Sequence, residues 1–225
     1  MTLLIAVFTL NQFLIQGVTK TMGMTHGTML SLFAVKQANA MEIMMPVPDA
    51  GGMVTHLQMM PTITEVVAEP NTGDTVADAK AVMIASGMPF YAPDGISFDD
   101  PIGALDAWGS YETLQLAPDM EERYQRLISI FPCNFCCGSP TSVTLNGRCG
   151  CAHSAAARGF FRYMLNTYGS TYSIDQLFGE AYRWQAIWYP SGVVEDYLLA
   201  TGRGDVLIHK THGGAGTDGM HGITQ

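Results

Sequence analysis

The cysteines of this chain are the feature that most constrains how it folds, because all five lie in one stretch. They run from Cys133 to Cys151, and His153 follows two residues later. The spacing is C-x2-C-C, a gap, and then C-x-C-x-H. The gap contains four turn-forming residues, Gly138, Pro140, Asn146 and Gly147. Such residues let the two arms of the stretch fold back toward each other, so side chains from both arms can converge on one point.

Convergence of thiols and an imidazole is typical of a metal site, and the sequence predicts a Cys/His metal knuckle here. Tetrahedral zinc takes four sulfur or nitrogen ligands, and soft thiolates also suit cuprous copper. A helix expected directly after the cysteines would stabilise thiolates at its start through its dipole. The candidate ligands for Zn or Cu are Cys133, Cys136, Cys137, Cys149, Cys151 and His153.

Other interpretations of the cysteines stay open. Disulfides are favoured in exported proteins, although an odd number of cysteines leaves one thiol over within the chain. A mixed arrangement would combine one disulfide with a metal or a redox pair. Cys133 and Cys136 form a C-x2-C pair that would suit a thiol-disulfide oxidoreductase, but no βαβ pattern surrounds it. Attachment of c-type haem needs C-x-x-C-H, and neither Cys133–Cys136 nor Cys149–Cys151 is followed in that way.

The amino-terminal residues 1–40 are apolar and predict an export leader or an uncleaved membrane anchor. One apolar run covers Leu3–Val18, and a second, Gly27–Val35, follows Lys20. Small residues in Ala38–Ala40 fit a signal-peptidase site. The alternative is a buried amphipathic helix at the start of a globular fold. With a leader or an anchor, we expect the cysteine-rich domain on the extracytoplasmic side and the membrane as a partner of the N-terminal segment.

The composition excludes one class of partner and favours two locations. Apolar residues make up 48% of the chain and charged residues 14%, with a net charge of −9. Typical soluble domains carry roughly a quarter of charged residues. Binding to nucleic acid needs a basic stripe, and none is present, so no nucleic-acid partner is expected. The low charge favours a membrane-associated or extracellular protein, or a surface covered by other protein subunits.

The chain divides by composition into four parts. After the leader, residues 41–78 are rich in Met, Pro and Gly and read as an irregular or extended segment that continues into a linker. Residues 79–204 form the predicted helical, Cys-rich domain, and residues 205–225 a Gly/His-rich tail. Methionines near histidine in the second part would suit cuprous copper or, more simply, fill irregular apolar contacts.

Helical patterns in the third part predict a mainly α fold, a small helical bundle that carries the metal knuckle. Ser173 with Gln176 three residues later is a capping-box signature. Trp184 and Trp188 are four residues apart, which indicates packing on one helix face. In residues 91–116, turn signals such as Asp100–Pro101 predict only short pieces. The helices are expected over residues 79–90, 117–132, 154–169, 173–190 and 191–204.

Three segments carry a resemblance to a known group of proteins: RYQRLISIFPCNFCCGSP, GRCGCAHSAAARGFFRYML and YSIDQLFGEAYRWQAIWYP. This arrangement resembles uncharacterised exported proteins related to the PCYCGCG-motif proteins, in which a cysteine-rich knuckle precedes helices with a Trp-containing end. The likeness covers about Met83 to Pro190 and is most specific in Cys133–Arg158. The resemblance implies export and metal or thiol chemistry.

Together these observations predict an extracytoplasmic, non-enzymatic metal-binding protein. One alternative is a structural subunit of a membrane complex or extracellular assembly, in which the cysteines form disulfide staples. The other is a thiol-disulfide oxidoreductase. The sequence contains no G-x-S-x-G, P-loop, G-x-G-x-x-G or H-E-x-x-H motif, so enzymes built on these motifs are not indicated.

Overall fold

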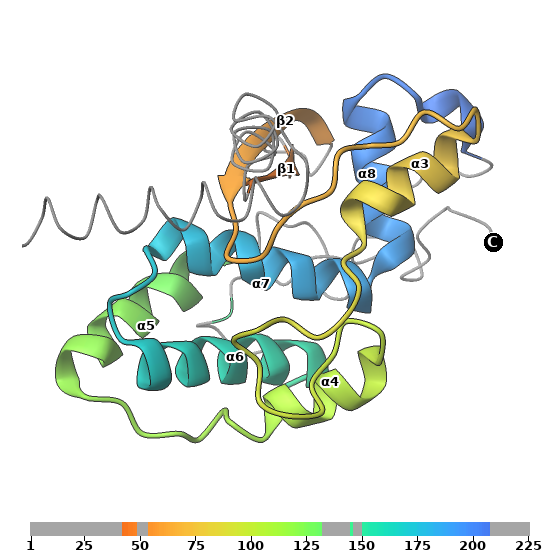
Figure 1. Ribbon diagram of the computed structural model, residues 1–225. Helices are drawn as coiled ribbons and strands as arrows, with labels where there is room; N and C mark the ends of the chain where they lie inside the picture. Colours follow the sequence, from red (N-terminus) through yellow and green to blue (C-terminus); the bar gives the residue numbers. More distant parts are fainter. Residues whose placement is uncertain (1–41, 49–53, 132–144, 146–149, 208–225) are drawn as a thin grey trace, which may run out of the picture. The chain divides into compact units, whose positions relative to one another are not determined.

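The computed structural model describes residues 42–48, 54–131, 145 and 150–207 (Figure 1). Within these residues it is mainly helical, as the sequence predicted, with one two-stranded antiparallel sheet. The elements are β1 (Glu42–Pro48), β2 (Val54–Pro61), α3 (Thr75–Met83), α4 (Pro101–Gly109), α5 (Pro118–Ile130), α6 (Ala152–Tyr168), α7 (Ile174–Trp188), α8 (Pro190–Ala200) and the short 3-10 helix η1 (Gly204–Val206).

Local capping signals set the ends of the long helices. Pro118 occupies the first turn of α5, where its missing N–H has no cost. The Ser173 side chain accepts from the N–H of Gln176, and the Gln176 side chain accepts from the N–H of Ser173, so the predicted capping box starts α7. Gly169 ends α6 with a φ of 56°, a conformation that glycine adopts without strain.

Helix α7 is the central element of the described fold. It lies between α6 on one side and the β1–β2 hairpin on the other (Figure 1). Every residue from Leu177 to Ile187 is buried. A helix that is buried all round needs small residues where neighbours approach closely, and Gly179 is one: a Cβ there would lie 2.0 Å from the Pro61 carbonyl oxygen. The contact sets α7 directly against the end of β2.

Helices α4 and α6 approach each other closely in the same way. A Cβ added at Gly159 of α6 would lie 1.8 Å from the Trp108 carbonyl oxygen of α4. The Trp108 ring is fully buried and meets Phe160 and Trp184 edge-on, with ring centroids 5.3 Å and 5.5 Å away. Trp184 is part of the core, as the sequence predicted, and its ring lies 6.2 Å from that of Trp188. Aromatic packing therefore joins α4, α6 and α7.

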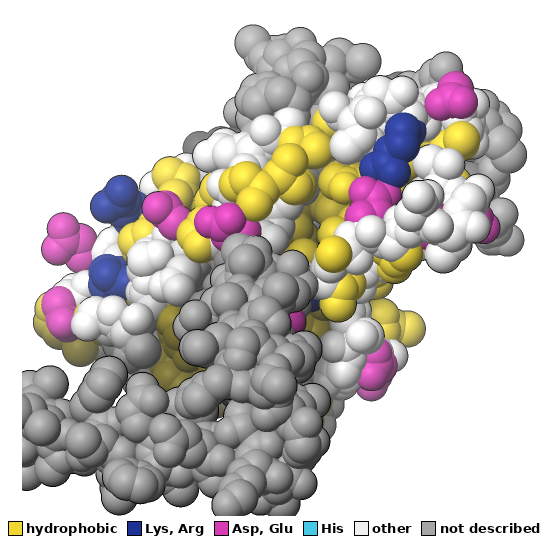
Figure 2. All heavy atoms as spheres, turned by 45° about the horizontal axis from the view of Figure 1, so that its top comes forward, with side chains coloured by type: hydrophobic (Ala, Val, Ile, Leu, Met, Phe, Trp, Pro, Cys, Tyr) yellow, Lys and Arg dark blue, Asp and Glu magenta, His cyan; other side chains and the backbone are white. Residues whose placement is uncertain are grey.

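Residues 41–78, predicted to be irregular or extended and then a linker, contain the hairpin and the start of α3. The strands pair antiparallel, with Met44 opposite Met59 and Ile43 opposite Met60. Ile43 is completely buried, which places that face of the hairpin on the helices. Hydrophobic side chains lie in an uneven band across the hairpin side of the molecule (Figure 2). No helix of the described part of the chain is long and apolar enough to cross a membrane.

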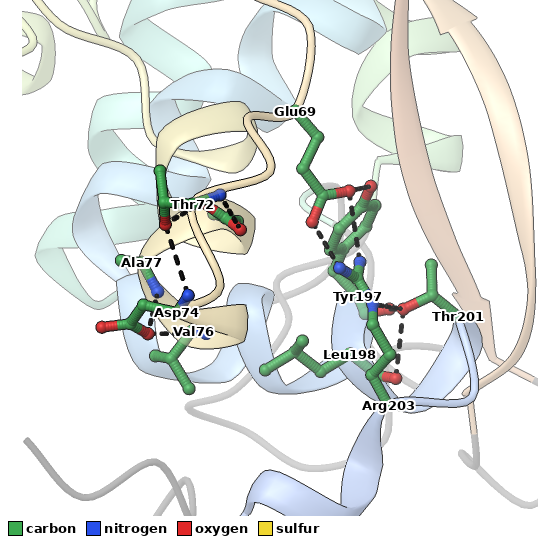
Figure 3. Close-up of polar contacts among 10 residues, drawn as sticks. Glu69, Thr72, Asp74, Val76, Ala77, Tyr197, Leu198, Thr201 and Arg203 are labelled. Carbon is green, nitrogen blue, oxygen red and sulfur yellow. Dashed lines mark hydrogen bonds and ion pairs between the residues drawn. The ribbon is translucent and has the colours of Figure 1, made fainter.

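The segment between β2 and α3 is held against α8 by a three-residue polar contact (Figure 3). The Arg203 guanidinium forms an ion pair with the Glu69 carboxylate, and the Tyr197 hydroxyl donates to the same carboxylate at 2.7 Å. Burial raises the pKa of Glu69, but the hydrogen bonds and the charge of Arg203 outweigh it, so the net pKa lies below 4.5. Burial and the neighbouring carboxylate raise the pKa of Tyr197 to about 12.

Helix α4 was not expected from the sequence. Asp100–Pro101 reads as a turn, yet it is the start of this helix: the Asp100 side chain accepts from the N–H of Gly103, and Pro101 occupies the first turn. The two residues signal a helix start as readily as a break. The helix is recognisable only with its packing partner, because Gly103 and Gly109 lower its own helix propensity.

Candidate metal site at the start of α6

Two of the six predicted metal ligands, Cys151 and His153, lie among the described residues. The other four, Cys133, Cys136, Cys137 and Cys149, lie outside them, as does the Gly/His-rich tail beyond Leu207. The described residues therefore include only one end of the predicted knuckle, where the chain enters α6.

Cys151 is the N-cap of α6. Its backbone is extended, with φ −75° and ψ 157°, and its Sγ accepts from the Ser154 N–H at 3.5 Å. The Ser154 hydroxyl also lies 3.4 Å from the same sulfur. A sulfur at this position lies at the positive end of the helix dipole, beside the N–H groups of the first helical turn.

His153 follows in the first turn of α6 and is half-buried. Its ring stacks on Tyr189 with centroids 4.4 Å apart, and Trp188 lies edge-on at 6.3 Å. Neither ring nitrogen has a hydrogen-bond partner among the described residues. Burial lowers the pKa of His153 from 6.5, which favours the neutral imidazole at neutral pH. Neutral imidazole is the form that coordinates zinc and copper.

Leu145 is the one described residue within the stretch between Phe131 and Gly150. Its side chain is buried, and its N–H donates to the Phe131 carbonyl at 3.1 Å. Its own carbonyl accepts from Arg158 of α6 at 3.4 Å. Arg158 in turn forms an ion pair of 2.6 Å with Glu112. These contacts hold Leu145 beside both the end of α5 and the first half of α6.

A small recess lies where these elements meet. Its volume is about 10 Å³, which is near the lower limit for one water molecule. Its lining residues come from the C-terminal cap of α5, the cysteine stretch, α6, and α7 with its C-terminal cap: Phe131, Leu145, His153, Ala157, Gln185, Trp188 and Tyr189. One edge of the His153 ring is therefore covered by apolar groups.

The described residues do not by themselves complete a metal site. Within the ranges that the structure describes, no group of three or more His, Cys, Asp or Glu side chains could hold an ion. Cys151 and His153 are separated by one residue at a helix start, so both belong to the same turn. An ion bound there needs further ligands, and the candidates for them are the four cysteines outside the described residues.

A second polar cluster, which sequence reasoning missed, lies in the core. Glu180 of α7 is completely buried. It accepts from four donors: the Ile63 N–H at 2.8 Å, the Thr64 N–H at 3.0 Å, and the Thr64 and Tyr91 hydroxyls at 2.7 Å. The signal for this role in the sequence is weak: an acid that follows Leu177, Phe178 and Gly179 in α7.

Neighbouring side chains complete the hydrogen bonding of this cluster. The Trp184 indole N–H donates to the Tyr91 hydroxyl at 2.7 Å, and Arg183 donates to the Thr64 hydroxyl at 2.6 Å. Burial and the charge of Glu180 raise the pKa of Tyr91 well above 10, so Tyr91 keeps its proton. The carboxylate is saturated by donors and borders no described cavity, which is typical of a structural role.

Comparison of the chain with family models, curated proteins and solved structures gave no match.

Proposed function

We propose that this chain is an extracytoplasmic metal-binding protein that holds a zinc or cuprous ion in its cysteine stretch and is not itself an enzyme. The ligands would be Cys151 and His153 together with members of the set Cys133, Cys136, Cys137 and Cys149. One observation carries the proposal. The start of α6 presents a thiol at a helix N-terminus and, in the same turn, an imidazole with no hydrogen-bond partner among the described residues.

The contacts of Leu145 support the convergence of ligands from both arms. Phe131, Leu145 and His153 line one recess, so three well-separated positions of the chain lie together there. Cys133 comes two residues after Phe131 in the sequence, and Cys149 comes two residues before Cys151. Two residues of chain span at most about 7 Å, so both cysteines are tethered within reach of the start of α6.

The donor set suits the proposed ions. Thiolates and imidazole bind zinc in tetrahedral sites, and thiolates also bind cuprous copper. The packing of His153 on Tyr189 restricts the orientation of the ring, which lowers the entropy cost of coordination. The extracytoplasmic location rests on the apolar, acid-free residues 1–40 and their small-residue end.

The test is native mass spectrometry of the full chain, with elemental analysis and thiol counting on the same sample. We expect one Zn or Cu per chain and at least three thiols that are alkylated only after chelation. Cys151→Ser is the sharpest variant, because serine is a good N-cap and preserves the helix start while removing the thiolate. His153→Ala should also weaken binding, whereas His221→Ala, in the tail, is the matched control.

Three outcomes would contradict the proposal. A metal-free chain whose mass is lower by two or four hydrogens would indicate disulfides and favour the structural subunit. Full metal content in both Cys151→Ser and His153→Ala would exclude the start of α6 from the site. A chain that exchanges disulfides with a dithiol substrate, and loses this activity in Cys133→Ser while keeping its fold, would instead be a thiol-disulfide oxidoreductase.

A further inference from the structure

The most exposed apolar side chains of the described residues gather in one short part of the chain. Ile102 is 76% exposed, Phe90 71% and Met88 59%, and each of the remaining exposed large hydrophobic residues has a lower value. A single exposed apolar side chain is ordinary, but three within residues 88–102 are not. Three such exposed side chains in one short segment indicate a surface that another molecule covers.

The backbone that carries these side chains is held firmly. Pro89 and Tyr91, on either side of Phe90, are both buried, and the Tyr91 hydroxyl donates to Glu180 in the core. Gly87, directly before Met88, accepts from the Phe98 N–H at 2.9 Å. The Phe90 side chain is therefore exposed on a fixed backbone. A partner that binds it loses little free energy to ordering the loop.

The same hydrogen bonds bring Met88 and Ile102 to one region. The Gly87 N–H donates to the Asp99 carboxylate at 3.0 Å, which sets Met88 beside the residues just before α4. Asp100 then caps α4, and Ile102 lies in the first turn of that helix. Asp106 is one turn further along, on the same face as Ile102. Apolar and acidic side chains thus alternate around the start of α4.

Among the described residues, no ion pair neutralises the aspartates of this region. Residues 81–122 contain no Lys, Arg or His. The ion pairs of the described residues neutralise Glu69, Glu112 and Glu121, and none of them involves an aspartate at the start of α4. Asp99, Asp100 and Asp106 are all exposed. The region therefore presents a negative potential around apolar side chains.

We propose that this acidic–apolar face docks a segment of a partner protein that presents apolar side chains together with Lys or Arg. The face consists of Met88, Phe90, Ile102, Asp99, Asp100 and Asp106. An exposed aromatic side chain on a rigid backbone is a common energetic centre of an interface, and the aspartates supply complementary charge for a basic partner. The proposal is independent of the metal site and goes beyond it.

Two other occupants fit the charges less well. A second copy that used the same face in a twofold dimer would bring aspartates against aspartates. A membrane rich in anionic lipid would repel the same carboxylates. The experiment below distinguishes both of these occupants from a partner segment.

The experiment titrates the full chain with two synthetic amphipathic helical peptides of equal length, one of Leu and Lys and one of Leu and Glu. Binding is measured by calorimetry at low and at physiological salt. We expect the Leu/Lys peptide to bind, with an affinity that falls as salt rises, and the Leu/Glu peptide not to bind. Phe90→Ser should weaken binding at least about tenfold, and Asp106→Asn should weaken it by a smaller factor.

Val67→Ser is the matched control, because Val67 is 57% exposed but lies in the segment between β2 and α3. It should bind the Leu/Lys peptide as the wild type does. Equal binding by Phe90→Ser and the wild type would overturn the proposal, since it would mean that the peptide responds only to net charge. Phe90-dependent binding to vesicles of phosphatidylcholine and phosphatidylglycerol, or Phe90-dependent dimerisation in sedimentation, without peptide binding would also overturn it.

Discussion

The Tyr91 hydroxyl donates a hydrogen bond of 2.7 Å to the Glu180 carboxylate, although the two residues are 89 positions apart in the chain. Glu180 accepts from Ile63 and Thr64 as well, so one side chain of α7 connects three separate parts of the fold. A buried carboxylate is costly unless donors surround it, and here they do. This cluster is therefore a place where a single substitution should have a large effect.

Replacing Glu180 with alanine should lower the free energy of unfolding by about 3–5 kcal/mol, because the Ile63, Thr64 and Tyr91 donors are left buried without an acceptor. Tyr91→Phe removes one of these donors and should cost about 1–3 kcal/mol. Urea unfolding monitored by circular dichroism measures both. The matched control is Glu65→Ala, whose exposed side chain should change the stability by less than about 0.5 kcal/mol. Equal effects at positions 65 and 180 would show that the cluster contributes nothing.

Gly159→Ala and Gly179→Ala should each destabilise the fold by about 1–3 kcal/mol or more, because the new Cβ meets a backbone carbonyl that cannot rotate away. The carbonyls are those of Trp108 and Pro61. Gly109→Ala, at the end of α4, has no atom within 4 Å of its Cβ and serves as the control. It should be neutral or stabilising by up to about 1 kcal/mol, because alanine favours a helix. Thermal unfolding of the three variants compares them directly, and a stable Gly159→Ala protein would contradict the close approach of α4 and α6.

Arg203→Ala should lower the stability by about 1 kcal/mol or less at pH 7, and the loss should disappear in acid. The folded pKa of Glu69 is below its unfolded value, so Glu69 stabilises the fold fully above pH 4.5 and loses this contribution as the pH falls through the folded pKa. The stability curves of wild type and variant should therefore converge below pH 4.5. Arg126→Ala, an exposed arginine of α5, is the control. Parallel curves down to pH 2 would refute the role of Glu69.

A metal held by His153 should affect the fluorescence of Trp188, because the two rings are 6.3 Å apart. Addition of paramagnetic cobaltous ion to the metal-free chain should quench tryptophan emission, whereas zinc should not. In Trp188→Phe the quenched fraction should be clearly smaller. The same fractional quenching in both proteins would place the bound ion away from α6, even if the stoichiometry remained one per chain.

The sequence was sufficient for the helices that carry their own end signals. Pro118 at the start of α5, the capping box of Ser173 and Gln176, and Gly169 after α6 are local, and these three helices appear close to their predicted bounds. α4 and the hairpin were not predicted as such. Both are short, and their stability comes from packing on α6, α7 and α8. Local pattern cannot reveal such contacts.

The sequence was sufficient to name the residues of the candidate site, but not the contacts that those residues make. The clustering of cysteines is a sequence property, and His153 was included because of its spacing. The roles that depend on tertiary contacts were not visible: the Sγ of Cys151 as a helix cap, the stacking of His153 on Tyr189, and the hydrogen bond from Leu145 to Phe131. Cys133, Cys136, Cys137 and Cys149 lie outside the described residues, so their part in the knuckle stays a prediction.

The dependence of the first half of the fold on α7 has a consequence for how the chain matures. During synthesis the N-terminal half emerges first, yet Ile63, Thr64 and Tyr91 find their acceptor only when Glu180 follows. Gly179, next to it, supplies the surface on which the end of β2 docks. Contacts between such distant positions form late and slow the folding reaction. These contacts of the first half of the fold therefore form only once the last third of the chain, which carries α7, is available.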